Sequence, residues 1–467
     1  MDLVHYGLDT SFEILGKWTP DYLNFQEAIT GTLHYGPDGF TLEIYGAFEF
    51  WTRTERIYGF SQDGKLIWIP QVNSRIETQS QTGYSIKKFS FPECFIFDMN
   101  LQKLGLNEKE AFEEIFKDAT TDFKVHELSF KTHHLLSWFG EPLSFSDMNG
   151  ELTIPHGTLH SNNYPYGNMD LKTEWTQVSQ STPQQIKVES EAEIFISKYK
   201  GKADFFKRLF QEVLNIKKLI ELFCEDDNFF DAISFQRKDN GLVFNGRYLV
   251  GQRASRSTSI LSESMLTLRD LEKDFNIILG NYDRKREKLD IVVDTYLNEF
   301  YLDETPETKI LNSIRNLEIY HRNFVEGNLP EHTDEALEIE RTKINDFIDK
   351  HVDPNYQVRM KSQVNYSPEK NLRKRLIELM QRMPEALFDH LEIKGKSKRK
   401  SRRISSFAYH VVETRNYYTH RDSPDRYPGR IQTIDELAEA NQILRKICLY
   451  YIYYELGIDE ELILRAL

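Results

Sequence analysis

The chain has 467 residues, of which 40% are hydrophobic and 13% aromatic, and its formal net charge is −14. This length exceeds one ordinary core, so we expect roughly two or three domains, and the apolar content excludes a wholly disordered protein. The acidic charge excludes a general nucleic-acid coat, so any site for a polyanion must be a local basic patch.

The three cysteines, Cys94, Cys224 and Cys448, lie far apart and lack the spacing of a metal site. This usage is typical of reduced thiols in a cytoplasmic protein. The first residues lack the basic segment and apolar run of a signal peptide, and no apolar run approaches the roughly 20 residues that cross a bilayer. We therefore expect a cytoplasmic protein that has no membrane partner.

Short runs rich in β-branched and aromatic residues fill the first half of the sequence. Segment 31–51 predicts a hairpin around the turn signal Gly36-Pro37-Asp38-Gly39. Further runs of this kind are ERIYGFS, KLIWIPQ, YSIKKFSF, ECFIFDM, DFKVHELSF, DLKTEWTQV, QQIKVESEAEIFI and GLVFNGRYLV. Their spacing predicts a β-rich domain like a sandwich or a barrel over residues 1–295, with added helices.

Helical periodicity appears first over residues 205–224, so a helical part of the first domain is expected from about residue 200. From about residue 262 the helical pattern is continuous. Thr305 is a candidate N-cap before Pro306, and Ser367 is a candidate N-cap for a later helix. We expect an all-helical bundle over residues 300–467, which makes the chain an α+β multidomain protein.

A basic run, KGKSKRKSRR over residues 394–403, interrupts this acidic chain with seven Lys or Arg in ten positions. Such a run is either a solvated loop or a contact for RNA phosphates. Its place shortly before the motif described next favours RNA. The candidate RNA-binding residues are Lys394, Lys396, Lys398, Arg399, Lys400, Arg402 and Arg403.

The most informative segment lies near the C-terminus, where a helix-patterned stretch ends in the hexapeptide RNYYTH, Arg415 to His420. Pro424, Pro428 and Gly429 then signal a loop. The pattern therefore predicts a permanent cation, an amide and a titratable imidazole at one helix end.

These groups suit the cleavage of RNA without a metal or a cofactor. The 2′-hydroxyl of RNA attacks the adjacent phosphorus and leaves a 2′,3′-cyclic phosphate, so a protein must move protons and offset the charge of the phosphorane. His420 can move protons near neutral pH, and Arg415 can hold phosphate oxygens. Asn416 shares a helix face with His420, so it can orient the imidazole or contact the phosphate.

Arg415 and His420 are five residues apart, which places them roughly 140° apart around a helix. They converge if the helix frays at His420, or if a second copy of the chain supplies the partner across a two-fold dimer. The alternative role of His420 is a helix C-cap that interacts with the helix dipole. The alternative for Arg415 is a surface salt bridge with Glu413 or Asp422.

Two other segments pair an arginine with a histidine at a similar spacing, and such a pair is expected about once by chance. RNLEIYH spans Arg315 to His321, in a helix where we expect Tyr320 and His321 to line the core. RISSFAYH spans Arg403, in the basic run, to His410, in the body of the predicted helix that ends in RNYYTH. Neither segment is predicted to end a helix at a loop.

The segment VVETRNYYTHRD resembles the signature of HEPN domains (higher eukaryotes and prokaryotes nucleotide-binding), many of which are metal-independent RNases with an arginine followed at short spacing by a histidine. NLEIYHRNF over 316–324 is similar to the early helix of the ApeA-like HEPN branch. FEILGKW and GTLHYGPDGFTLEIYGAF are similar to the opening of the N-terminal domain that accompanies this branch. The resemblance covers most of the chain in the expected order.

The resemblance implies a bacterial anti-phage abortive-infection protein with an endoribonuclease domain that acts as a homodimer. RNA and a phage-derived trigger are its implied partners. Arg415 and His420 match the catalytic pair, and Asn416 matches the polar residue after the arginine. Glu318 and His321 lie in the matching early helix, where we expect them to support the site or the fold. The N-terminal domain is expected to sense a signal or to restrain the nuclease.

Two functions of other classes stay open. The chain can be an HEPN-like module that binds RNA or another ligand without catalysis, with the β-rich domain as the sensor. It can also be a sandwich that binds carbohydrate or peptide through exposed tryptophans, although tryptophans more often fill cores. The candidates for that role are Trp18, Trp51, Trp68 and Trp138.

A metal site is the weakest alternative. His126, His133 and His134 lie close in sequence, but no cysteine or carboxylate spacing supports them as ligands. We therefore expect no metal and no cofactor.

Overall fold

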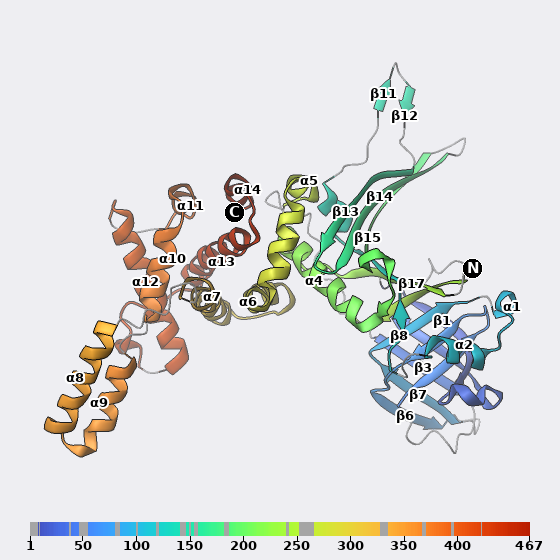
Figure 1. Ribbon diagram of the computed structural model, residues 1–467, viewed down its shortest axis with the longest axis horizontal. Coiled ribbons are helices and arrows are strands. Elements are labelled where there is room, and N and C mark those ends of the chain that lie inside the picture. Colours follow the sequence, from blue (N-terminus) through green and yellow to red (C-terminus); the bar gives the residue numbers. More distant parts are fainter. Residues whose placement is uncertain are drawn as a thin grey trace. The chain divides into compact units, whose positions relative to one another are not determined.

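The computed structural model divides the chain into two compact units, residues 1–280 and 281–467, and each unit is considered by itself (Figure 1). The structure describes residues 8, 10–36, 39–45, 55–79, 85–99, 101–117, 121–140, 146–148, 151–153, 157–181, 186–239, 242–251, 266–326, 335–366, 370–393, 397–421 and 423–467.

The first unit is built on a 14-stranded sheet within these residues, and neighbouring strands pair antiparallel. Along the sheet the strands are β13 (Gly157–Tyr166), β14 (Met169–Ser181), β15 (Ile186–Lys198), β10 (Glu127–Thr132), β17 (Phe230–Asp239), β18 (Leu242–Val250), β8 (Glu93–Asp98), β5 (Leu66–Ile69), β4 (Ile57–Ser61), β1 (Phe12–Thr19), β2 (Ile29–Gly36), β3 (Gly39–Tyr45), β7 (Ser85–Phe91) and β6 (Ser74–Gln79). The prediction of a β-rich first half is therefore confirmed.

Short elements complete the first unit. Two small sheets pair β11 (Ser146–Met148) with β12 (Glu151–Thr153) and β9 (Lys124–Val125) with β16 (Asp204–Phe205). Its helices are η2 (Tyr22–Glu27), α1 (Leu101–Leu104), α2 (Glu108–Ile115), α3 (Leu135–Phe139), η3 (Tyr199–Gly201), α4 (Phe206–Cys224) and α5 (Leu268–Leu271). Helix α4 confirms the helix predicted over 205–224.

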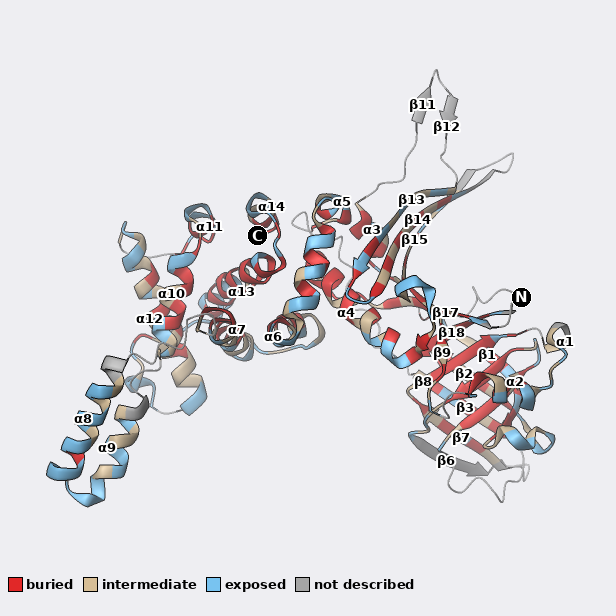
Figure 2. Cartoon of the chain, in the orientation of Figure 1, coloured by how far each residue is buried: buried red, intermediate tan, exposed pale blue. Residues whose placement is uncertain are grey.

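The predicted hairpin is formed by β2 and β3, which pair up to Gly36 opposite Gly39. Pro37, Asp38 and residues 46–51 lie outside the described residues. Burial alternates along these strands, because successive side chains point to opposite faces of the sheet (Figure 2).

The tryptophans fill the core of the first unit. Trp18, Trp68 and Trp138 are at most 1% exposed, so they present no surface to a carbohydrate or a peptide. Trp51 lies outside the described residues. The reading of these three residues as an exposed ligand-binding set is therefore wrong.

The second unit is helical within the described residues, as the sequence predicted. It contains α6 (Phe275–Tyr301, which begins in the first unit), α7 (Pro306–Tyr320), the π-helical turn η4 (His321–Glu326), α8 (Glu335–His351), α9 (Pro354–Tyr366), α10 (Leu372–Arg382), α11 (Glu385–His390), α12 (Lys400–His420), η5 (Pro424–Arg426), α13 (Ile434–Leu456) and α14 (Glu460–Ala466). Residues 295–300, the predicted domain boundary, lie within α6, and the domain limits stay a prediction.

Helix α13 has most of its residues buried, above all in its second half (Figure 2). Polar contacts fix α7 against it: Ser313 donates to Asn441 over 2.7 Å, and the Tyr320 hydroxyl donates to Glu455 over 2.8 Å. Burial, together with the charge of Glu455, raises the pKa of Tyr320, so the hydroxyl stays protonated and keeps donating.

One of the two predicted helix N-caps, Thr305, is present, and the other, Ser367, is not the cap of its helix. Thr305 caps α7 through the Thr308 amide, and Pro306 takes the first helical position, as expected. Ser367 is not the cap of α10, because that helix begins at Leu372 and the side chain of Asn371 accepts from the Lys374 amide over 2.9 Å. Ser367 itself lies outside the described residues.

Candidate functional site at the end of helix α12

Helix α12 is unbroken from Lys400 to His420 and carries the predicted motif in its last two turns (Figure 1). It stops because Arg421 adopts the left-handed conformation, with φ of 49°, and its amide donates back to the Tyr417 carbonyl over 2.7 Å. The helix end predicted after His420 is therefore present, and the helix does not fray before that residue.

The loop after α12 folds back along the helix. The ring Nδ1 of His410 lies 2.6 Å from the Gly429 carbonyl oxygen, and the Ile431 amide donates to the Thr414 hydroxyl over 2.8 Å. His410 is thus engaged in fixing the loop, which explains why RISSFAYH is no rival for the site.

Arg415 lines an open groove between α7 and α12. The groove has a volume of about 400 Å³, and we call it the arginine groove. Its lining residues are Leu311, Asn312, Ile314, Arg315 and Glu318 of α7 and Arg415 and Thr419 of α12. A volume of this size lies within the roughly 300–1,000 Å³ that small-molecule sites occupy.

Arg415 has no charged partner among the residues that the structure describes. Its Nη1 donates to the neighbouring Asn416 Oδ1 over 3.2 Å, and the described part of the chain offers it no carboxylate at ion-pair distance. The expected alternative of a bridge to Glu413 is absent there, and Asp422 lies outside the described residues. An arginine held by an amide alone keeps its full charge for a ligand.

His420 is the exposed last residue of the helix, and it points away from the arginine groove by geometry. Five residues of regular helix turn it roughly 140° from Arg415. Asn416 shares the face of His420, whereas Thr419 shares the face of Arg415. Within one chain, the helix therefore does not bring the predicted catalytic pair together.

Tyr418 is the ring beside these groups, and it is half-buried. Burial raises its pKa first, and the charge of Glu307 raises it further. The Tyr418 phenol is therefore protonated and neutral near pH 7, so it does not serve as a general base at that pH.

Glu318 and His321 belong to a polar cluster between α7, η4 and α10. Oε1 of Glu318 accepts from Arg375 over 3.1 Å and from Arg322 over 3.0 Å. His321 is fully buried, and its Nε2 lies 3.0 Å from a carboxylate oxygen of Glu378. Burial lowers the pKa of His321, so the ring is held neutral inside the bundle.

This burial excludes His321 from contact with a substrate, so RNLEIYH is not a second catalytic motif. Glu378 accepts from Lys370 and His321, and although partial burial acts in the opposite direction, these bonds lower its pKa to about 2. The cluster is thus a charged support for α7, which carries one wall of the arginine groove.

The basic run lies at the other end of α12. Lys398 and Arg399 are exposed before the helix, Lys400, Arg402 and Arg403 form its first turn, and Lys394 and Lys396 lie outside the described residues. Arg403 donates to the Ile393 carbonyl over 2.6 Å and lies over the Phe388 ring.

Arg399 and Arg415 are sixteen positions apart, which corresponds to about 24 Å along the helix axis. The expectation that the run flanks the catalytic cleft is therefore not met within one chain. Contact between the run and RNA stays a prediction.

Among the described residues, one group places a histidine and two carboxylates close enough together to hold a metal ion. The ligand atoms of His134, Asp226 and Asp227 all lie within 4.8 Å of one another, at the end of α4 and the start of α3. His134 Nε2 lies 3.4 Å from Asp226, and burial lowers the pKa of His134. The predicted histidine set differs, because His126 Nδ1 accepts from the Lys238 amide over 2.9 Å.

The first unit also has an open groove on its sheet, with a volume of about 280 Å³. Polar residues from adjacent strands line it, and they include Glu127, Ser129, Gln236 and Asn245. Sequence reasoning missed this groove because its residues come from strands that are far apart in the chain.

Arg315 was also missed as a site residue. The sequence presented it only as the first residue of a rival motif, and its place opposite Arg415 depends on how α7 packs against α12.

Two protein-family models match the chain. ApeA N-terminal domain 1 matches residues 13–282, and Apea-like HEPN matches residues 311–462. No curated protein and no solved structure matches. Separately, none of the helices described is both long and apolar enough to span a bilayer.

Proposed function

The chain belongs to the family of ApeA-like HEPN proteins, and from this membership we propose that it is a metal-independent endoribonuclease that acts in anti-phage defence by abortive infection. The observation that carries the proposal is the guanidinium of Arg415 in the arginine groove, which has no carboxylate partner among the described residues and lies next to a helix end that presents Asn416 and His420. Its place of action is the cytoplasm, where RNA is the substrate.

In the proposed reaction, the RNA 2′-oxygen attacks the adjacent phosphorus, and the 5′-oxygen of the next nucleotide leaves. The products are a 2′,3′-cyclic phosphate and a 5′-hydroxyl. Arg415 binds the non-bridging oxygens and offsets the charge that grows on the phosphorane. His420 transfers a proton, either from the attacking 2′-hydroxyl or to the leaving oxygen.

We propose that Asn416 acts through Arg415. Its carboxamide oxygen accepts from Arg415, so it fixes the guanidinium and not the imidazole. The bond pulls the Arg415 side chain toward the face that Asn416 shares with His420. We assign Asn416 as the residue that positions Arg415.

The active enzyme is a homodimer through the HEPN domain. One continuous helix separates Arg415 from His420 by roughly 140°, so a second copy must bring its His420 to the first copy's Arg415. Two-fold symmetry then forms two such pairs, each with the Arg415 of one chain and the His420 of the other.

The basic run binds the RNA backbone on either side of the cut. Lys398, Arg399 and Arg402 are exposed at the start of α12, roughly 20–26 Å from Arg415 along the axis. An RNA strand that lies along the helix passes both ends. Such phosphate contacts make affinity fall with rising salt.

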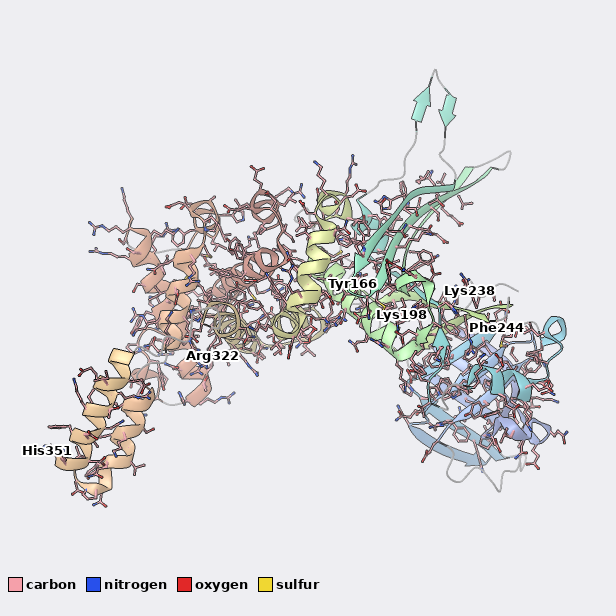
Figure 3. All side chains as sticks on the ribbon, in the orientation of Figure 1. Tyr166, Lys198, Lys238, Phe244, Arg322 and His351 are labelled. Atoms are coloured by element: carbon pink, nitrogen blue, oxygen red, sulfur yellow. The ribbon has the colours of Figure 1, made fainter. Side chains whose placement is uncertain are left out.

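The test is cleavage of total RNA by the purified protein in the presence of EDTA. Cleavage that leaves cyclic-phosphate ends, and that is lost in Arg415→Ala and His420→Ala, supports the proposal. Arg359→Ala and His351→Ala are matched controls, because both residues are exposed on helices away from the groove (His351 is labelled in Figure 3). RNA that stays intact with the wild type rejects the nuclease.

A second function is favoured by the groove of about 280 Å³ in the first unit. In this alternative, the HEPN domain binds RNA or another ligand without cutting it, and the β-rich domain is the sensor. The same experiment separates the two, because a binding module retains RNA and produces no cyclic-phosphate ends.

A further inference from the structure

Arg315 occupies the wall of the arginine groove that faces helix α12. It is exposed, and it lies on α7, 100 positions before Arg415 in the sequence. The groove is therefore lined by one arginine from each of two helices. This juxtaposition is the starting point for a second phosphate contact.

The two arginines are not neutralised from within the described chain. Arg415 has only the amide oxygen of Asn416 as a partner, and Arg315 has no hydrogen-bond or ion-pair partner there. Glu318 also lines the groove, but its Oε1 is already bound by Arg375 and Arg322. The charge of this carboxylate is thus offset by groups outside the groove.

Two cations in one groove repel each other unless an anion joins them. In a chain with a net charge of −14, carboxylates are abundant, yet among the described residues none forms an ion pair with either guanidinium. An arginine pair kept free in this way has the chemistry of an oxyanion site, since each planar fork can bind two oxygens of a phosphate.

The rest of the lining suits a nucleotide more than a lone inorganic ion. Leu311 and Ile314 give the groove an apolar wall, and Asn312 and Thr419 add polar groups. The volume of about 400 Å³ exceeds what a single oxyanion needs. A sugar and base can lie against the apolar wall while the phosphates meet the arginines.

We propose that Arg315 binds the RNA phosphate next to the scissile one, so that Arg315 and Arg415 hold two successive phosphates of one strand. This inference rests on the proposed function in naming RNA as the ligand. Arg315 is a substrate-binding residue that touches the backbone outside the reacting centre. It sets the register of the strand and leaves the chemical step to Arg415 and His420.

The test measures binding separately from cleavage. In full-length protein carrying His420→Ala, a short fluorescent single-stranded RNA is titrated by anisotropy at several salt concentrations. Adding Arg315→Ala is expected to weaken binding about tenfold, because a charge-assisted hydrogen bond is lost. The slope of log affinity against log salt is expected to fall by about 0.7, the value for one phosphate contact on a single strand.

Arg315→Lys keeps the charge but loses the fork, so we expect an intermediate affinity and an unchanged salt slope. Arg359→Ala removes an equally exposed helical arginine and is expected to change neither quantity. With an intact His420, Arg315→Ala should raise KM and leave kcat nearly constant, whereas Arg415→Ala should lower kcat. Thermal unfolding of each variant checks that the fold is kept.

The outcomes separate this inference from the nuclease itself. If Arg315→Ala binds RNA like its parent with the same salt slope, the inference is overturned even where the wild type cleaves. If the wild type does not cleave but Arg315→Ala still weakens RNA binding, the groove stands as an RNA-phosphate site and the nuclease fails. A chain that neither binds nor cleaves RNA overturns both.

Discussion

Arg415 donates a hydrogen bond from Nη1 to Oδ1 of Asn416 over 3.2 Å, and this bond joins two faces of helix α12. One face carries Arg415 and Thr419 and lines the arginine groove, and the next carries Asn416 and His420. The bond therefore links the phosphate-binding charge to the face from which a second chain can approach.

Replacing this amide by a carboxylate is expected to damage the site more than removing it. In Asn416→Asp, the new carboxylate pairs with the Arg415 guanidinium and competes with RNA phosphate. We expect its initial cleavage rate to be about tenfold below that of Asn416→Ala. Asn355→Asp makes the same charge change on the exposed start of α9 and should cleave normally. Equal rates for the two Asn416 variants would contradict the role of the bond.

The pH dependence of stability tests the buried His321. Burial lowers its pKa in the folded chain, so the unfolded chain takes up a proton first as pH falls below about 6.5. The contribution of neutral His321 to the free energy of unfolding is fully present above that pH. It is lost as the pH falls toward the pKa of His321 in the folded chain. We expect His321→Gln to flatten the decline of the unfolding temperature between pH 7 and pH 5.

His351→Gln is the control for this measurement, because that ring is exposed at the end of α8. Glu378 affects stability in a lower pH range, because its pKa is lowered to about 2. Its contribution to the free energy of unfolding is therefore lost only in stronger acid. A decline of the same slope in His321→Gln and in the wild type would show that His321 is not the group responsible.

The limits of the second unit give a prediction about fragments. Helix α6 is tied to the bundle, because Asn316 donates to the Val292 carbonyl over 2.9 Å and Arg445 lies 2.9 Å from Glu299. A fragment of residues 281–467 keeps these partners, whereas 300–467 removes α6 and exposes the surface beneath it. We expect a cooperative thermal transition by circular dichroism for the first fragment and none for the second.

The longer fragment also tests whether the β-rich unit restrains the nuclease. Expression of residues 281–467 in growing cells is expected to be more toxic than expression of the whole chain, and His420→Ala in the fragment should abolish the difference. Toxicity that is equal for the fragment and the whole chain, at matched expression, would argue against restraint by the first unit.

Local signals in the sequence predicted much of this architecture. Thr305 and Pro306 start α7 as expected, and the loop prolines place the motif at a helix end. The N-cap Asn371 was missed because the more conspicuous Ser367-Pro368 pair stands nearby.

The site could be predicted only in part, because a motif describes neighbours along the chain. Arg315 and Arg415 line the same groove because α7 packs against α12. The spacing of residues along the sequence does not show this packing. The basic run was expected beside the motif, but a continuous helix carries it about 24 Å away. The burial of His321 likewise depends on α10, because Glu378 of α10 contacts His321 and Arg375 of α10 contacts Glu318 of α7.

The most direct test of the shared dimeric site is complementation between two inactive chains. Arg415→Ala and His420→Ala are co-expressed with different tags, purified together, and assayed for RNA cleavage. Each variant alone is expected to be inactive, whereas a mixed dimer unites the intact Arg415 of one chain with the intact His420 of the other. Random pairing then restores about one quarter of the wild-type sites. Mixed dimers that stay as inactive as either variant, while the wild type cleaves, would contradict this account.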